Sequence, residues 1–385
     1  MIKYFKILLY TTLILIIVAN CIDPFYPDIE EYENVLVVDG FITNENSVYK
    51  VKLSRTQHFD DAENKPVPGA VVQVIDDSGN VYLFRETKTG TYESNPGEFT
   101  GQVGRKYKLN IETTDGNKYE SGFEGMKNIP EIDSIYWEYK EKPASDVNNP
   151  YRGIQILIDT HDPENKTRYY RWSWSETWEF VTPYHKDTLP RHCWKKDSSR
   201  VIEISSTDHL TEDIIRNYPL YFISEGTNRL SIRYSILVRQ YSLTSDCFNY
   251  WSRIRETNEN TGTLFDPIPT QVIGNITDLN NPDKPVLGYF QASAVASKRI
   301  FIDRSELIAL PLSVSSGFEY CESLIVKDSL DNPRPEYLGY VENYGWVIYF
   351  QEVSGPILVT YLTNSISCVD CSLTGTPVKP DFWIE

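Results

Sequence analysis

The cysteine and histidine side chains are the groups in this chain whose chemistry the sequence restricts most. Residues 183–199 form a polar segment that holds His185, Asp187, His192 and Cys193. A structural zinc needs four ligands, and the spacing of these residues matches no zinc-binding pattern. We therefore predict no metal site and no cofactor, and we expect Cys193 to form a disulfide.

A second cysteine group lies near the carboxyl end, where Cys368 and Cys371 form a Cys-x-x-Cys pair after a strand pattern at residues 357–361. A thioredoxin-type site needs a strand followed by a helix that lowers the pKa of one thiol, and a zinc ribbon needs a second such pair. The sequence shows neither. We expect one or both sulfurs to bond to Cys193 or Cys321, or to each other, and to hold down the C-terminal tail.

Residues 168–180 carry the clearest alternating pattern of the chain. One face is aromatic except for a single carboxylate: Tyr170, Trp172, Trp174, Glu176, Trp178 and Phe180. Such a strand packs the core of a β-sandwich, or it offers Trp172, Trp174 and Trp178 as contacts for a sugar or a peptide. In the second interpretation Glu176 is a polar contact to the ligand. The sequence leaves both interpretations open.

No catalytic motif accompanies these residues. The chain contains no Gly-x-Ser-x-Gly nucleophile elbow, no phosphate-binding glycine loop and no His-Glu-x-x-His zinc motif. Aspartate and glutamate are plentiful, so counting them leaves a glycosidase pair, and with it a surface hydrolase, as an alternative. We expect the protein not to be an enzyme.

The composition indicates an acidic protein built mainly of β-strands. The 385 residues include 54 Asp and Glu against 37 Lys and Arg, which gives a formal net charge of −17. This charge argues against binding to nucleic acid and against direct docking on anionic lipid. Aromatic residues make up 13% of the chain, with 27 tyrosines, and short Tyr-, Val-, Ile- and Thr-rich segments between turn residues are typical of strands.

Residues 34–126 are expected to form a first domain, an Ig-like β-sandwich. Strand patterns at residues 35–42, 49–54 and 71–75 are separated by turn residues, and Asp115-Gly116 joins two alternating runs as in a β-hairpin. The succession PVPGA at 66–70, GTY at 90–92 and GRKY at 104–107 resembles the carboxypeptidase-regulatory, transthyretin-like domains. That resemblance implies an Ig-like, seven-stranded module with a structural or adhesive role.

A larger β-rich domain is expected over residues 131–385. It opens with a strand at 132–139, and a long alternating strand follows at 230–241. Two short helices are predicted. One covers residues 211–217, and the other begins after Thr244, which is a good N-cap before apolar residues at helical spacing.

The first 20 residues have the pattern of a signal peptide. Lys3 and Lys6 precede an apolar run at residues 7–18 that is too short, and wrongly flanked, for a membrane-spanning helix. The segment Val-Ala-Asn-Cys that ends at Cys21 resembles the lipobox of bacterial lipoproteins, although Asn20 replaces the usual small residue. The resemblance implies lipidation of Cys21, and two or more acyl chains anchor a protein stably. An uncleaved anchor or an ordinary secretory signal is the alternative.

Residues 21–33 are expected to form an acidic tether. Pro24 and Pro27 block regular structure, and the acidic residues around them favour an extended linker. An acidic segment directly after the lipidated cysteine also resembles the surface-export signal of Bacteroidota lipoproteins. Export would place the other five cysteines in an oxidising compartment, where an odd number leaves at least one unpaired.

Several segments together resemble a lipoprotein family of unknown function from Bacteroidota. They are YSILVRQYSL at 234–243, TGTLFDPIP at 261–269, VLGYF at 286–290 and the terminal KPDFW at 379–383. Members of that family are often associated with TonB-dependent outer-membrane receptors. The resemblance implies a lipid-anchored outer-membrane protein, on the periplasmic or cell-surface face, that accompanies such a transporter or captures its ligand. It implies no site residues. A structural or adhesion lipoprotein of the cell surface is the alternative.

Overall fold

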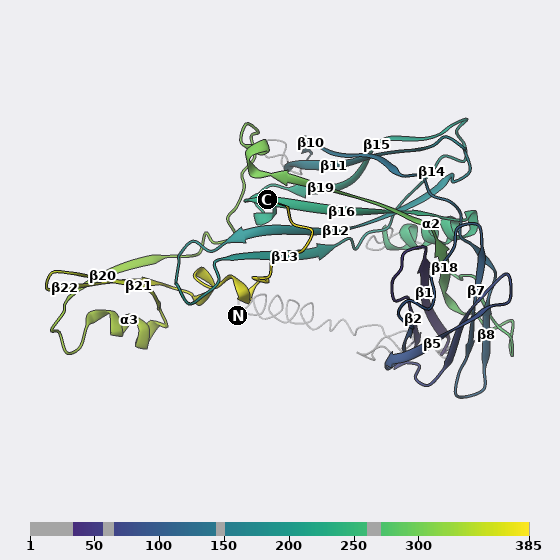
Figure 1. The fold of residues 1–385 in the computed structure, drawn as a ribbon, viewed down its shortest axis with the longest axis horizontal. Coiled ribbons are helices and arrows are strands. Elements are labelled where there is room, and N and C mark those ends of the chain that lie inside the picture. The colour runs from purple at the N-terminus through teal and green to yellow at the C-terminus, as the bar shows by residue number, and fades with distance from the viewer. Residues whose placement is uncertain (1–33, 57–64, 144–150, 260–270, 385) are drawn as a thin grey trace, which may run out of the picture.

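A computed structural model describes residues 34–56, 65–143, 151–259 and 271–384 (Figure 1). Within these residues the chain is mainly β with two α-helices, which confirms the expected fold class. Three parts follow one another along the long axis of the molecule: a curled sheet, a two-sheet sandwich and a small lobe. Cys21, the predicted signal peptide (1–20) and the acidic tether (21–33) lie outside the described residues.

The curled sheet occupies one end of the molecule. Its eleven strands are β1 (Leu36–Thr43), β2 (Lys50–Arg55), β3 (Lys65–Pro66), β4 (Val71–Asp76), β5 (Val81–Lys88), β6 (Thr91–Ser94), β7 (Lys106–Glu112), β8 (Lys118–Ser121), β9 (Glu124–Gly125), β17 (Ile276–Asp278) and β18 (Leu287–Ser293). Side chains at alternating positions, among them Val51, Tyr92 and Leu109, fill its inside. Strand β6 pairs with both β5 and β2. The sheet is therefore hydrogen-bonded without a break, whereas an Ig-like sandwich has two separate sheets.

Two strands of this sheet come from far along the chain, which corrects the division into residues 34–126 and 131–385. Strand β18 pairs in parallel with β1, and β17 pairs with β8. The close approach depends on Gly288, because a Cβ there would lie 1.8 Å from the carbonyl oxygen of Val38 and because its φ is +96°. Residues 276–293 therefore complete the first part of the molecule.

The sandwich in the middle consists of two antiparallel sheets. One contains β10 (Ile132–Lys142), β11 (Tyr151–Asp162) and β15 (Asp213–Ser224); the other contains β13 (His192–Ser198), β12 (Tyr169–Val181), β14 (Glu203–Ser206), β16 (Arg233–Ser242) and β19 (Val295–Asp303). On one side Lys298 of β19 donates through Nζ to the carbonyl oxygens of Ile132 and Asp133 in β10, at 3.1 and 2.6 Å. The opposite side, along the edge strands β15 and β13, is open over part of its length; elsewhere the hydroxyl of Tyr218 in β15 donates to Glu203 and to the carbonyl oxygen of Ile204 in β14, at 2.8 and 3.3 Å.

The two predicted helices of this region have different outcomes. Helix α2 (Ser245–Glu259) is confirmed, and Thr244 caps it by accepting the N–H of Cys247 through Oγ1 at 3.2 Å. The helix predicted at residues 211–217 is wrong, because strand β15 begins at Asp213 and pairs with β11. Pairing with a neighbouring strand overrides a weak local preference for helix.

No helix among the described residues has the length and apolar character needed to cross a membrane.

The lobe lies at the far end of the molecule from the curled sheet (Figure 1). It contains β20 (Ser323–Ser329), α3 (Glu336–Tyr344), β21 (Val347–Ser354) and β22 (Ile357–Thr363), and β22 is the central strand. Four short 3₁₀ turns are η1 (Asn228–Leu230), η2 (Arg304–Leu307), η3 (Ile366–Cys368) and η4 (Cys371–Leu373). The last two lie at the base of the lobe.

Candidate ligand-binding cleft

The aromatic face of β12 points into the sandwich. Trp172 is 1% exposed; its indole Nε1 donates to Gln240 at 2.9 Å, and its ring lies 4.6 Å from that of Tyr218. Trp178 is 3% exposed and donates to Asn228. For these two tryptophans the structure favours the first of the two interpretations, since both rings pack in the core between the two sheets.

Trp174 and Glu176, from the same face, reach a cleft at the open side of the sandwich. The cleft has a volume of about 500 Å³. Its lining comes from six strands and the segment that joins β13 to β14: Lys142, Gln155, Trp174, Glu176, Asp197, Ser198, Ser199, Arg200, Val201, Glu203, Pro219, Leu220, Tyr221 and Phe222. Of the three tryptophans that the sequence offers as ligand contacts, the structure leaves Trp174 beside a cavity.

A β-bulge in the edge strand β15 shapes one wall of the cleft. Ile156 pairs with Tyr221 and Leu157 pairs with Pro219, so Leu220 is an extra residue on β15. Bulges bend a strand and re-aim its side chains, and they are common beside binding sites. The bulge brings the ring of Tyr221 to 4.9 Å from that of Trp174.

The floor of the cleft contains a buried, fully paired carboxylate. Glu176 is 2% exposed; Oε1 accepts from Nε of Arg229 at 3.0 Å, and Oε2 accepts from the hydroxyl of Tyr234 at 2.8 Å. Burial, and after it the charge of Glu176, raises the pKa of Tyr234 well above its usual range, so Tyr234 stays a donor. Arg229 also contacts Asp197 at 3.4 Å and lies over the ring of Trp178. This network gives each oxygen of Glu176 a hydrogen-bond partner in the floor of the cleft.

The rim of the cleft carries charges of both signs. Nζ of Lys142 lies 4.1 Å from the centre of the Phe222 ring, and Arg200 contacts Asp197 at 3.3 Å. A hydrogen bond from the backbone N–H of Ser198, and after it the nearby arginines, lowers the pKa of Asp197. Glu203 accepts from Tyr218 at 2.8 Å. Aromatic walls with both charge signs at the rim suit a polar ligand that has apolar faces.

A second groove continues from the cleft across the outer face of the three-stranded sheet. Its volume is about 520 Å³, and it shares Lys142, Gln155 and Pro219 with the cleft. The other lining residues are Glu138, Lys140, Glu141, Leu157 and Asn217. The two hollows together form an extended track, which fits a chain-like ligand better than a compact one.

The expected disulfides lie at the base of the lobe, about the η3 and η4 turns. Cys193 is bonded to Cys371, and Cys321 is bonded to Cys368. Each sulfur of the Cys-x-x-Cys pair therefore has a different partner, which gives the pair a structural role. Among the described cysteines, Cys247 is free and buried.

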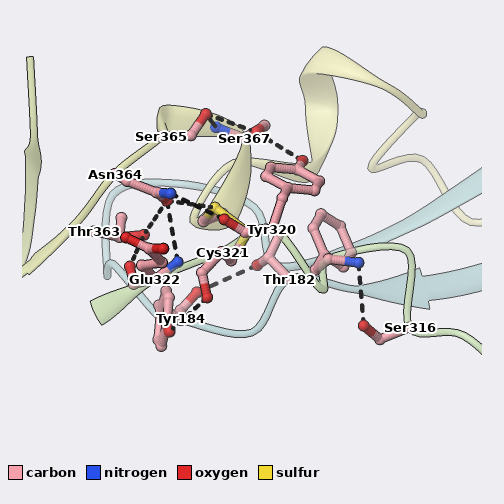
Figure 2. The surroundings of a disulfide bond; sticks show 12 residues. Thr182, Tyr184, Ser316, Tyr320, Cys321, Glu322, Thr363, Asn364, Ser365 and Ser367 are labelled. Carbon is pink, nitrogen blue, oxygen red and sulfur yellow. Dashed lines mark hydrogen bonds between the residues drawn. A yellow bond between two sulfur atoms is a disulfide. The ribbon is translucent and has the colours of Figure 1, made fainter.

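Figure 2 shows hydrogen bonds around the Cys321–Cys368 bridge. Asn364 donates through Nδ2 to the carbonyl oxygen of Tyr320 at 2.9 Å and accepts the N–H of Glu322 at 3.1 Å. Tyr184 from the sandwich donates to the carbonyl oxygen of Cys321 at 3.3 Å. The base of the lobe is thus attached to the sandwich by hydrogen bonds as well as by the Cys193–Cys371 disulfide.

The polar segment between β12 and β13 separates its candidate metal ligands. His185 pairs with Asp187 at 3.0 Å, and His192 pairs with Glu179 at 3.2 Å. In the part of the chain that the structure describes, no group of three or more His, Cys, Asp or Glu side chains is placed to hold a metal ion.

Sequence reasoning missed most of the cleft. Arg229, Tyr221 and Asp197 come from separate segments, and nothing in their local sequence marks them as neighbours. The available signal was Glu176, the one carboxylate on an otherwise aromatic face. A charge at a core position needs a partner, so this interruption was a signal for an ion pair that the sequence interpretation did not use, and it could not have identified Arg229.

Comparison with known protein families gives a match over most of the chain. A family model described as a domain of unknown function (DUF4249) covers residues 22–299. The matched range contains the curled sheet and all residues that line the cleft. A search of the curated proteins finds no match.

Proposed function

This chain belongs to the DUF4249 family, whose description states no activity, and we therefore propose a function from the features of the chain itself. The protein is an outer-membrane lipoprotein, anchored through Cys21, that binds a ligand in the cleft between β15 and β13. It serves as a non-catalytic accessory of a TonB-dependent transporter. The anchor rests on the lipobox pattern, and the transporter rests on the family resemblance of the sequence.

The cleft is the observation that carries ligand binding. It lies on the side of the sandwich between β15 and β13, combines Trp174 and Tyr221 with charged rim residues, and continues into a second groove. Ligand sites are typically concave, with apolar walls and a few fixed polar groups. Because both oxygens of Glu176 are already hydrogen-bonded, this carboxylate supports binding and not hydrolysis.

Chain-like glycans are favoured over extended peptides as the ligand class. A peptide would bind here by adding a strand to the free edge of β15, using backbone hydrogen bonds. Pro219 has no N–H to offer, and the bulge at Leu220 breaks the regular spacing of the edge. Sugars are instead recognised through side chains, of which the rim offers Lys142, Arg200 and Glu203.

Calorimetric titration of the detergent-solubilised full chain against panels of oligosaccharides and peptides tests this function. Arg200→Ala is a suitable cleft variant because the Arg200 side chain is 84% exposed, so we expect its removal to leave the fold intact. We expect at least about tenfold weaker binding of the glycan, as for loss of a charged contact. Lys50→Ala, an exposed cation on the curled sheet, is the matched control and should bind within about twofold of the wild type.

A panel in which no oligosaccharide binds, or in which Arg200→Ala and Lys50→Ala bind equally well, would contradict the assignment of the cleft. Binding of peptides alone would keep the cleft as the site and replace the ligand class.

A further inference from the structure

The lobe exposes an unusual amount of apolar surface for its size. Its exposed large apolar side chains are Ile325, Leu330, Tyr344, Phe350, Val353 and Ile357, with exposed fractions from 40% to 73%. Its buried apolar side chains are Val326, Val359 and Leu362, and helix α3 contains no buried residue. A contiguous exposed apolar patch on a soluble protein marks an interaction site.

Three of these side chains and Tyr361 share one face of the three-stranded sheet. Ile325 and Phe350 both pair with Tyr361, so the three side chains lie abreast on one face. Ile357 follows on the same face of β22 after Val359, which pairs with Lys327 and Glu352. The rings of Phe350 and Tyr361 are 5.5 Å apart. We call Ile325, Phe350, Ile357 and Tyr361 the lobe face.

Helix α3 covers the opposite face of this sheet. Asp328 and Val326 lie on that opposite face, and Oδ2 of Asp328 accepts the N–H of Glu336, the first residue of α3, at 2.7 Å. In Figure 1 the helix lies to one side of β20 and β22. The lobe face is therefore the side of the sheet that α3 leaves bare.

The lobe face is held in a fixed position relative to the sandwich. The Cys321–Cys368 bridge joins the two ends of the lobe, and the Cys193–Cys371 bridge ties its base to β13. Tyr184 of the sandwich also stacks on Tyr349 of β21, with ring centres 4.8 Å apart. A surface held in this way loses little conformational entropy on binding, which favours its use for docking.

The charge of the lobe decides between the possible occupants. Residues 319–363 contain seven acidic side chains (Glu319, Glu322, Asp328, Asp331, Glu336, Glu342 and Glu352) and two basic ones (Lys327 and Arg334). A second copy of this chain would bring the same negative charge against the first, and an anionic lipid surface would also repel it. A protein surface with an apolar centre and a rim of lysine and arginine is complementary to the lobe.

We propose that the lobe face is the surface through which this protein docks on its partner, and that the partner presents there an apolar patch ringed by basic residues. This inference rests on the proposed function, since it takes the TonB-dependent transporter as the partner. Tyrosine and other aromatic residues, which the lobe provides in Tyr340, Tyr344, Trp346, Tyr349, Phe350 and Tyr361, are enriched at protein interfaces.

Recovery of the transporter with variants of the full lipidated chain tests the proposal. The tagged chain is extracted from outer membranes in mild detergent, and the co-purified transporter is quantified by mass spectrometry. Ile325→Lys and Phe350→Lys place a cation on the lobe face, 52% and 51% exposed in the wild type. We expect recovery to fall at least about tenfold for the double variant, because it removes apolar contacts and opposes the basic rim.

Val81→Lys with Leu83→Lys is the matched control. Both side chains are apolar, 53% and 46% exposed, and lie on β5 of the curled sheet, so the control makes the same change in character away from the lobe. Its recovery should stay within about twofold of the wild type. Thermal unfolding of both double variants verifies that each is folded.

The outcomes separate the two proposals. If the wild type recovers no transporter, the proposed function fails and the docking inference fails with it. If the wild type and the lobe variant recover the transporter equally, the docking inference alone is overturned.

A photo-crosslinking amino acid at position 350 gives a second readout in the otherwise unchanged chain. Crosslinks to a lysine- and arginine-rich surface of the transporter support the proposal. Crosslinks to a second copy, or binding to phosphatidylethanolamine–phosphatidylglycerol vesicles that the lobe variant loses, would overturn it.

Discussion

Glu176 shows that the type of a single residue can indicate which partners it needs in the folded protein. It is the one carboxylate on the aromatic face of β12, and the structure gives both of its oxygens hydrogen-bond donors. A buried charge without such partners would cost several kcal/mol. The ion pair was therefore predictable from the type of residue, whereas its partner Arg229, 53 positions away, was not.

Replacing Glu176 with Gln should destabilise the protein strongly. The substitution keeps the shape of the side chain but removes the closer of the two carboxylates that pair with Arg229, so that only Asp197, at 3.4 Å, remains. Loss of one partner of a buried pair costs about 3 kcal/mol, which urea unfolding of the purified protein would measure. Glu164→Gln breaks the exposed pair with Lys166 and should change the stability by less than about 1 kcal/mol. Equal effects of the two variants would show that the Glu176 pair is not buried.

Glu124 should make the stability of the protein depend on pH. It lies where the curled sheet meets α2; it accepts from Thr244 and Tyr289, and burial raises its pKa from 4.5 to about 7. Between pH 4.5 and pH 7 the folded state therefore keeps a proton on Glu124 that the unfolded state releases. The contribution of this proton to the stability of the fold is complete below pH 4.5 and is lost as the pH rises through 7, by about 3 kcal/mol in total.

Urea unfolding at pH 5 and pH 8 measures this dependence. Glu124→Gln should remove most of the additional loss of stability at pH 8, because the amide stays neutral at both values. Glu131→Gln, a change at an exposed carboxylate, should leave the difference between the two pH values as in the wild type. If Glu124→Gln and the wild type lose the same stability between pH 5 and pH 8, the carboxyl group is not buried as described.

At the scale of elements, the sequence pattern predicted those strands and helices whose conformation follows from their own residues. The alternating residues of β1, β2 and β12 and the capped helix α2 were visible in the sequence, because each pattern matches the period of its own element. The strand at residues 213–224 was not visible in the sequence, because its pairing with β11 determines its conformation. The pairing of β18 with β1 joins residues about 250 positions apart, and no periodicity encodes such a partner.

The lobe should depend on its disulfides more than the rest of the molecule does. Replacing Cys321 and Cys368 together by Ala opens a link across 47 residues, and the chain-entropy model gives a loss of about 4 kcal/mol for a loop of this size. Few buried apolar side chains remain to hold the lobe. We expect limited proteolysis to cut within residues 322–367 first and to leave the sandwich and curled sheet intact.

Cys247→Ala is the control, because Cys247 is the free cysteine of the described chain and lies outside the lobe. Its substitution should not expose the lobe to protease. Proteolysis of the sandwich before the lobe in the double variant would contradict the view that the disulfides stabilise the lobe locally.

At the scale of the whole molecule, the order of the chain and the order of the parts in space differ. The expected two domains are in fact three parts, and the first is completed by residues 276–293. The lobe, from β20 to β22, then leads away from the sandwich, and the chain is attached to the sandwich again by Cys371. The cleft and the lobe face thus lie on different parts of the molecule, and the proposed ligand and the proposed partner would not compete for one surface.

The proposed anchor predicts where the whole molecule is found in the cell. Cys21→Ser removes the thiol that would be acylated, so the protein should move from the membrane fraction to the soluble fraction and lose incorporation of labelled palmitate. Asn20→Gly, which places a small residue before the cysteine, should leave both properties unchanged. Retention of Cys21→Ser in the membrane would indicate an uncleaved anchor instead of a lipid.

The most direct test of the account is the composition of the complex that contains this chain in its own membrane. Native mass spectrometry of the wild-type protein, extracted from outer membranes in mild detergent, measures it. We predict one copy of the lipidated chain for each copy of a TonB-dependent transporter. A lipidated chain that is monomeric in every mild extract would contradict the account.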